Sequence, residues 1–146
     1  MTEQPTNQQT AKAYGLGLLA GVGFALLYSV GAEVVGLNWG LIVVALFGGW
    51  VIGGAVSYGA WAGQQHRRVR RLQTAALVIG CGSWLLALVL GYLISQALIP
   101  QAATPLLDRL SPSGFIDYFG GLFDYVRLIH LLGLALLTFM AWRSAR

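Results

Sequence analysis

The sequence predicts an all-α integral membrane protein: a four-helix bundle whose helices span the bilayer, with one or two short interfacial helices between the third and fourth. Three observations lead to this fold class. Apolar residues make up 57% of the 146 residues and charged residues only 10%, whereas a soluble domain carries about 25% charge. Four apolar runs have the length of a membrane span. The basic residues also gather on one side of the resulting topology.

Each span is identified by its length, because an α-helix rises about 1.5 Å per residue and about 20 apolar residues cross the hydrocarbon core. The runs 13–35 and 39–61 contain a single charge, Glu33, near the end of the first. The third run, 72–99, exceeds the minimum and allows some tilt. The fourth, 126–142, is the shortest, and Arg127 and His130 occupy its first turns.

The orientation follows from the basic residues, which are retained on the cytoplasmic side near the ends of spans. Only Arg109 and Arg127 fall on the opposite side, whereas one side holds Lys12, Arg67, Arg68, Arg70, Arg71, Arg143 and Arg146. We therefore expect a multi-pass protein of the cell membrane with both termini cytoplasmic. The chain divides into a polar tail at 1–12, the transmembrane domain at 13–142 and a basic end at 143–146.

The first apolar run also permits another interpretation. Lys12, the apolar stretch and the small residues Val30, Gly31 and Ala32 resemble a signal peptide cleaved after Ala32. The apolar stretch is longer than a usual signal core, so an uncleaved span is favoured. Cleavage of residues 1–32 remains the alternative.

The two shorter connections have different chemistry. Residues 36–38 form a turn short enough to make the first two helices a hairpin. The second connection, 63–71, is basic and contains Arg67, Arg68, Arg70 and Arg71. These arginines set the orientation, which is the interpretation we favour. Alternatively, they bind anionic lipid headgroups.

The third connection, 100–125, is long enough to have structure of its own. Thr104 before Pro105 and Ser111 before Pro112 are helix-start signals, which predict two short helices. In the second helix, apolar residues recur at helical spacing: Phe115, Ile116, Phe119, Leu122, Phe123 and Val126. We expect this helix to lie in the membrane interface with no protein partner for its apolar face. In the alternative, it folds back over the outer ends of the spans.

Small residues repeat every four positions within three of the spans, which predicts close helix packing. The helix-packing residues are Gly17, Gly21, Gly49, Gly53, Ala87 and Gly91. For the first two rows we favour packing within one chain over an interface with another copy or a partner. The row on the third span is more open, because the fourth span has no obvious matching row.

Titratable residues near the membrane suggest one polar cluster, formed by Glu33, Asp124, Arg127 and His130. Such a cluster has the chemistry to pass protons or cations. We favour a structural role instead, with an ion pair between Asp124 and Arg127 and a hydrogen bond from His130 to a neighbouring helix. No catalytic motif is present. We therefore expect no enzymatic activity, no cofactor and no metal.

The glycine-spaced run 40–56, the arginine-rich connection and the closing Ala141, Trp142 and Arg143 resemble bacterial four-span membrane modules of unknown activity. This resemblance supports the architecture and assigns no functional residue. We expect a non-enzymatic accessory or scaffold subunit that binds other membrane components. Its partners would be membrane lipid, another membrane protein or a second copy, but not nucleic acid. A small oligomeric transporter or channel is the alternative.

Overall fold

The computed structural model describes residues 5–61, 69–98, 111–121 and 127–145. Within these ranges the chain is helical almost throughout and contains no strand. The helices are α1 (Asn7–Glu33), α2 (Gly40–Trp61), α3 (Arg70–Leu98), α5 (Pro112–Gly121) and α6 (Arg127–Ser144). The predicted all-α fold is therefore confirmed for the described part of the chain.

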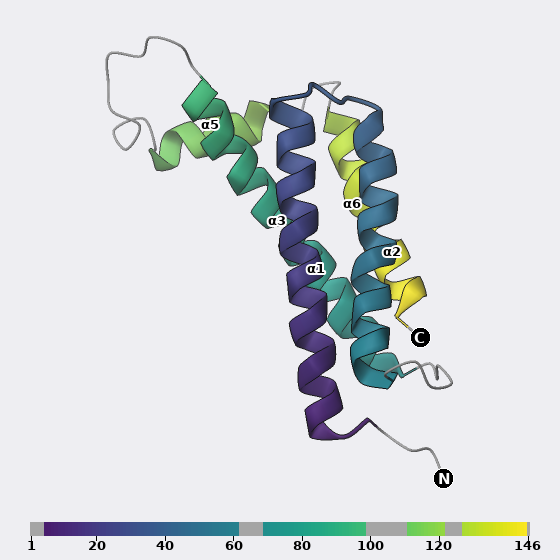
Figure 1. Cartoon of the computed structure of the whole chain (residues 1–146). Helices are drawn as coiled ribbons and strands as arrows, with labels where there is room; N and C mark the ends of the chain where they lie inside the picture. The colour runs from purple at the N-terminus through teal and green to yellow at the C-terminus, as the bar shows by residue number, and fades with distance from the viewer. Residues whose placement is uncertain (1–4, 62–68, 99–110, 122–126, 146) are drawn as a thin grey trace.

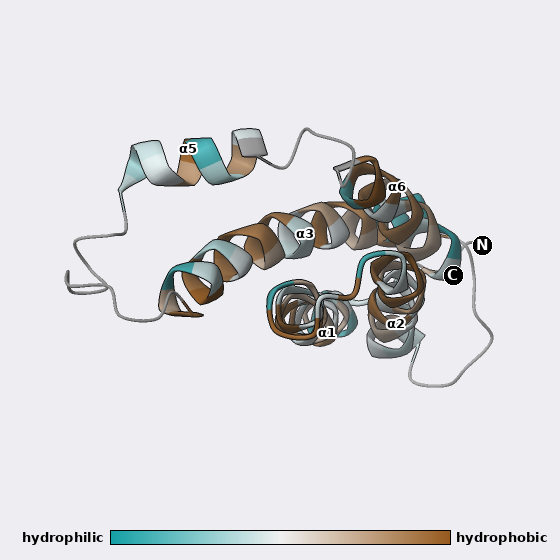
Figure 2. Ribbon diagram, turned by 90° about the horizontal axis from the view of Figure 1, so that it is seen from above, coloured by the Kyte–Doolittle hydropathy of each residue, from teal (hydrophilic) through white to brown (hydrophobic). Residues whose placement is uncertain are grey.

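The four longer helices stand side by side, and α5 lies outside them, near one end of this bundle (Figure 1). We call the end where α1 and α3 begin the N-terminal end, and the end where α1 turns into α2 the hairpin end. Helix α1 packs against α2 and α3, and α6 packs against α2 and α3. Seen from the hairpin end, α5 lies beside α3 (Figure 2).

Helix α1 begins six residues before the predicted start of the first span, and a capping box explains why. The Thr6 hydroxyl accepts a hydrogen bond from the Gln9 backbone N–H, and the Gln9 side chain accepts one from the Thr6 backbone N–H. These two bonds satisfy groups that a helix start leaves unpaired. The first turns of α1 are largely polar. The prediction followed apolar residues only, so it placed the start of the helix too late.

The predicted turn between the first two helices lies where α1 ends. Gly36 has a φ of 68°, a left-handed conformation that glycine adopts without steric cost. Leu37 then donates its backbone N–H to the Gly31 carbonyl at 2.9 Å, which closes the end of α1. The chain reverses direction and α2 begins at Gly40.

Small residues stand where the helices approach most closely. A Cβ at Gly17 would lie 2.6 Å from Val56 of α2. At Gly21 it would meet Ser83 of α3, and at Gly49 and Gly53 it would meet backbone carbonyls of α6. Ala87 is buried, and a Cβ at Gly91 would lie 2.8 Å from the Tyr118 hydroxyl. Each of these positions thus has a contact within the chain itself.

Helix α6 packs more regularly than the sequence suggested. Residues at four-residue spacing along one face are buried: Gly133, Leu137, Ala141 and Ala145. Gly49 lies against Leu137 and Gly53 against Ala141, so α6 runs parallel to α2. These contacts are with α2, so they do not test the expectation that the fourth span has no row matching the one on the third. The row on α6 is not made of small residues alone, because Leu137 belongs to it.

Three of the described helices, α1, α2 and α3, are long and apolar enough to cross a membrane. Helix α6 is shorter, with 18 residues. Large apolar side chains lie on the outside of the bundle, and Leu19, Leu27 and Trp39 are 71%, 70% and 67% exposed. An outer surface of this kind is typical of a protein surrounded by lipid.

Helix α5 starts at the predicted Ser–Pro signal. Ser111 caps it by accepting the Gly114 backbone N–H at 3.0 Å. The other predicted start, at Thr104 and Pro105, lies outside the described residues. Phe115 and Tyr118 contact Tyr92 of α3, and Phe119 packs against the core of the bundle. The expectation of an apolar face without a protein partner is therefore wrong for this part of α5, because Tyr92 of α3 packs against it. Phe123 lies outside the described residues.

Candidate functional site

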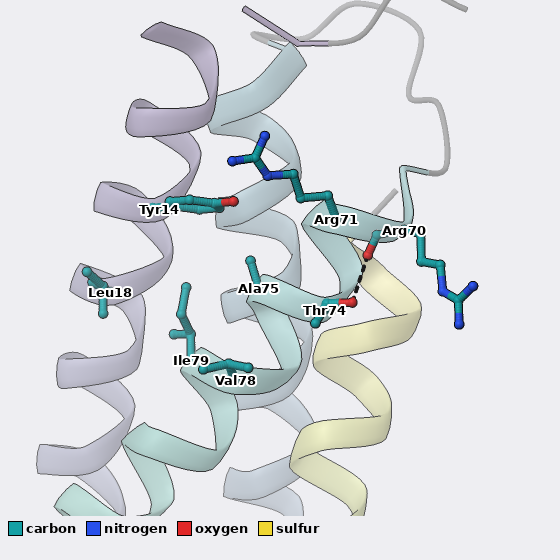
Figure 3. A pocket seen from close by; sticks show the side chains of 8 residues that line it. All are labelled: Tyr14, Leu18, Arg70, Arg71, Thr74, Ala75, Val78 and Ile79. Atoms are coloured by element: carbon teal, nitrogen blue, oxygen red, sulfur yellow. Dashed lines mark hydrogen bonds between the residues drawn. The ribbon is translucent and has the colours of Figure 1, made fainter. Parts of the chain in front are cut away.

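A groove with a volume of about 650 Å³ lies between α1 and α3 at the N-terminal end of the bundle. Its walls are apolar along most of their length, and its polar groups gather where α3 begins (Figure 3). The groove is lined by Tyr14, Leu18, Arg70, Arg71, Thr74, Ala75, Val78 and Ile79. Because only two neighbouring helices line it, it opens at the side of the bundle and does not run through the centre.

Two arginines lie at the mouth of the groove, because α3 begins at Arg70. The Arg71 side chain extends toward α1, on the side where Tyr14 lies, whereas the Arg70 guanidinium extends away from Tyr14 (Figure 3). Thr74 donates its hydroxyl to the Arg70 carbonyl at 3.0 Å, which holds the first turn. Of the four predicted headgroup-binding residues, the structure thus places Arg70 and Arg71 beside the groove. Arg67 and Arg68 lie outside the described residues.

The hairpin end carries a hydrogen bond between α5 and α1. The Tyr118 hydroxyl donates to the Glu33 carboxyl at 2.6 Å. Gly91 of α3 provides the space, since any side chain there would meet that hydroxyl. Burial raises the pKa of Tyr118 above its ordinary value, and the hydrogen bond and negative charge of Glu33 raise it further. The hydroxyl therefore stays protonated and remains a donor.

A second polar contact joins α1 to α6 inside the bundle. The Tyr28 hydroxyl and His130 Nδ1 are 2.9 Å apart, and both side chains are buried. Their rings meet edge to face with centroids 5.8 Å apart. Each polar group thereby gives the other a partner that lipid cannot supply.

The predicted polar cluster is only partly described. Glu33 pairs with Tyr118, and His130 pairs with Tyr28. Asp124 and the side chain of Arg127 lie outside the part of the chain that the structure describes, so their predicted ion pair stays a prediction. The hydrogen bond of His130 to a neighbouring helix is the arrangement that the sequence analysis favoured.

Sequence reasoning missed the tyrosines as partners. Tyr28 and Tyr118 supply the hydroxyls to His130 and Glu33, and Tyr92 packs on α5. A buried phenol needs a hydrogen-bond partner, so a tyrosine well inside a span was a usable signal. Which polar group it pairs with depends on how the helices assemble, and sequence spacing does not contain that information.

A second groove, of about 620 Å³, lies between α1 and α2 toward the hairpin end. Its lining is apolar throughout and includes Phe24, Leu27, Val43, Phe47 and Val51. Like the first groove, it is bounded by two adjacent helices and opens sideways. No charged residue lines it.

Among the described residues, no three histidine, cysteine or acidic side chains lie close enough together to hold a metal ion. Comparison with family models, curated proteins and solved structures finds no match for the chain. Only the chain's own residues therefore bear on its function. Its three long apolar helices and its exposed apolar surface support a helical membrane protein.

Proposed function

We propose that this chain is a four-span protein of the cell membrane, with both termini in the cytoplasm, that acts without catalysis. Its role is that of an accessory or scaffold subunit that binds other membrane components. The observation that carries this proposal is the position of the two described grooves. Each is bounded by two adjacent helices and opens sideways, toward where lipids and partner proteins lie.

The packing of α6 supports its assignment as the fourth span. Its 18 residues extend about 27 Å, close to the thickness of a hydrocarbon core. It runs beside α2, and small residues bring the two backbones together at Gly49 and Gly53. Arg143 in its last turn suits a cytoplasmic end.

The packed centre of the bundle argues against a conducting path through the described residues. Ser29 and Ser83 donate their hydroxyls to carbonyls of their own helices, Leu26 and Ile79. Between them lie small and apolar residues in close contact, such as Gly21 and Ala25. A pore needs polar groups facing an open passage at this depth.

A small oligomeric transporter or channel remains the second candidate, and one observation favours it. The buried Tyr28–His130 pair is a polar site inside a span, and such sites often belong to ion or proton pathways. Flux measurements separate the two candidates. Proteoliposomes containing the protein should pass protons and potassium no faster than empty vesicles. Faster flux that is lost in His130→Ala would establish the transporter and overturn the scaffold.

The topology is tested by cysteine labelling in intact cells, in a Cys81→Ala background. Ser113 and Gln8 are both exposed and stand at opposite ends of the bundle. A membrane-impermeant maleimide should label Ser113→Cys from outside and label Gln8→Cys only after the cells are opened. The reverse pattern would overturn the orientation, and labelling of both would show mixed insertion.

A further inference from the structure

We propose that the groove between α1 and α3 holds one anionic phospholipid of the cytoplasmic leaflet. Its phosphate would lie between the Arg71 guanidinium and the Tyr14 hydroxyl, and an acyl chain would follow the apolar walls. This inference rests on the proposed function and names the membrane component that this site binds. The sequence indicated only that the arginines of this connection lie near headgroups, whereas the structure offers one defined position for a lipid.

The chemistry of the mouth fits a phosphate. A guanidinium is planar, always charged and presents paired N–H donors that match phosphate oxygens. Arg71 is exposed and lines the groove at its mouth. Tyr14 is half-buried on the facing helix and adds a hydroxyl donor on the same side. Arg71 therefore offers a positive charge at the mouth of the groove, where a phosphate would meet it.

The body of the groove fits an acyl chain. From Arg70 to Ile79 the wall on α3 extends about 13 Å along the helix axis. Leu18 and Val78 line this stretch while remaining 56% and 61% exposed. A hydrocarbon chain lying there would cover both side chains.

The order of these features along the helices favours a lipid over a free phosphate. Charge lies at the end of the bundle where α3 begins, and the apolar wall continues from there into the span. In the proposed topology this end faces the cytoplasm, where anionic lipids attract basic residues. A soluble anion would use only the mouth and leave the apolar wall uncovered.

The test is native mass spectrometry of the full-length protein, delipidated in detergent and titrated with phosphatidylglycerol or phosphatidylcholine. We expect a first phosphatidylglycerol to bind more tightly than phosphatidylcholine. Arg71→Gln should weaken that first event about fivefold, the effect of one basic group near an anionic headgroup. Arg70→Gln removes the same charge from the adjacent residue and should weaken it less than about twofold.

Two further variants test the wall and the hydroxyl. Ala75→Phe places a ring inside the groove and should weaken binding, whereas Leu19→Phe, outside the groove on α1, should not. Tyr14→Phe removes one hydroxyl and should weaken binding by a smaller factor than Arg71→Gln. Because this last change is minimal, it keeps the test valid if a larger substitution impairs folding.

Several outcomes would overturn the lipid site. Equal effects of Arg71→Gln and Arg70→Gln would show diffuse attraction rather than a defined position. Displacement of phosphatidylglycerol by excess inorganic phosphate, or an unaffected Ala75→Phe variant, would show an anion site without an acyl chain. None of these results would alter the flux measurement, so failure of the lipid site is distinguishable from failure of the scaffold role.

Discussion

The two ends of the bundle differ in how their polar groups are arranged. At the hairpin end, Glu33 and Tyr118 satisfy each other, and Tyr28 and His130 do the same deeper in the bundle. At the N-terminal end, Arg71 stands at the mouth of an open apolar groove. Polar groups paired within the chain hold helices together, whereas a charge beside an uncovered apolar wall is suited to a ligand.

This contrast also separates stability from function. Each paired contact joins two helices: α5 to α1 through Tyr118, and α1 to α6 through Tyr28. Breaking one should lower the free energy of unfolding and leave the distant groove intact. Changes at Arg71 should alter binding at the groove and leave the free energy of unfolding nearly unchanged, because an exposed charge contributes little to folding.

The largest effect on the free energy of unfolding is expected where α2 packs against α6. Gly53→Leu would drive a side chain into the Ala141 carbonyl of α6 and the backbone of Ala145. Overpacking of this kind should cost about 3 kcal/mol of unfolding free energy, measured by denaturation in mild detergent. Gly54→Leu is the matched control, because nothing lies within 4 Å of that position. Equal stability of the two variants would contradict the packing of α6 on α2.

The packing glycines also show which contacts can be predicted from the sequence and which cannot. Spacing alone selected Gly53 and Gly21 as packing positions, because a four-residue repeat of small residues places them on one helix face. The Ser111–Pro112 pair predicted the start of α5 in a different way, because serine is a favoured helix cap and proline a favoured first helical residue. Spacing did not pair Glu33 with Tyr118, which are 85 residues apart, because that contact depends on the tertiary arrangement of three helices. It also gave no sign of the α1–α3 groove, because a cavity exists only after two helices have packed.

A smaller effect is expected at the hairpin end itself. Tyr118→Phe removes the hydrogen bond to Glu33 while keeping the ring contacts with Tyr92. The loss should be about 1 kcal/mol, seen as faster hydrogen exchange across α5. Tyr58→Phe serves as the control, because Tyr58 is 62% exposed on α2. Phosphatidylglycerol binding at the groove should not change, and a change there would mean that the two ends are coupled.

The smallest effect concerns the buried pair Tyr28 and His130. A double-mutant cycle with Tyr28→Phe and His130→Ala isolates their coupling from the packing that each side chain contributes. We expect about 0.6 kcal/mol, the average measured for hydrogen bonds between membrane helices. Such a value fits a contact that only joins α1 to α6. No coupling would show that each group finds another partner once its neighbour is removed. A coupling above about 2 kcal/mol would exceed the range for such contacts, and it would indicate a strongly organised polar site, which the transporter model requires and the scaffold model does not.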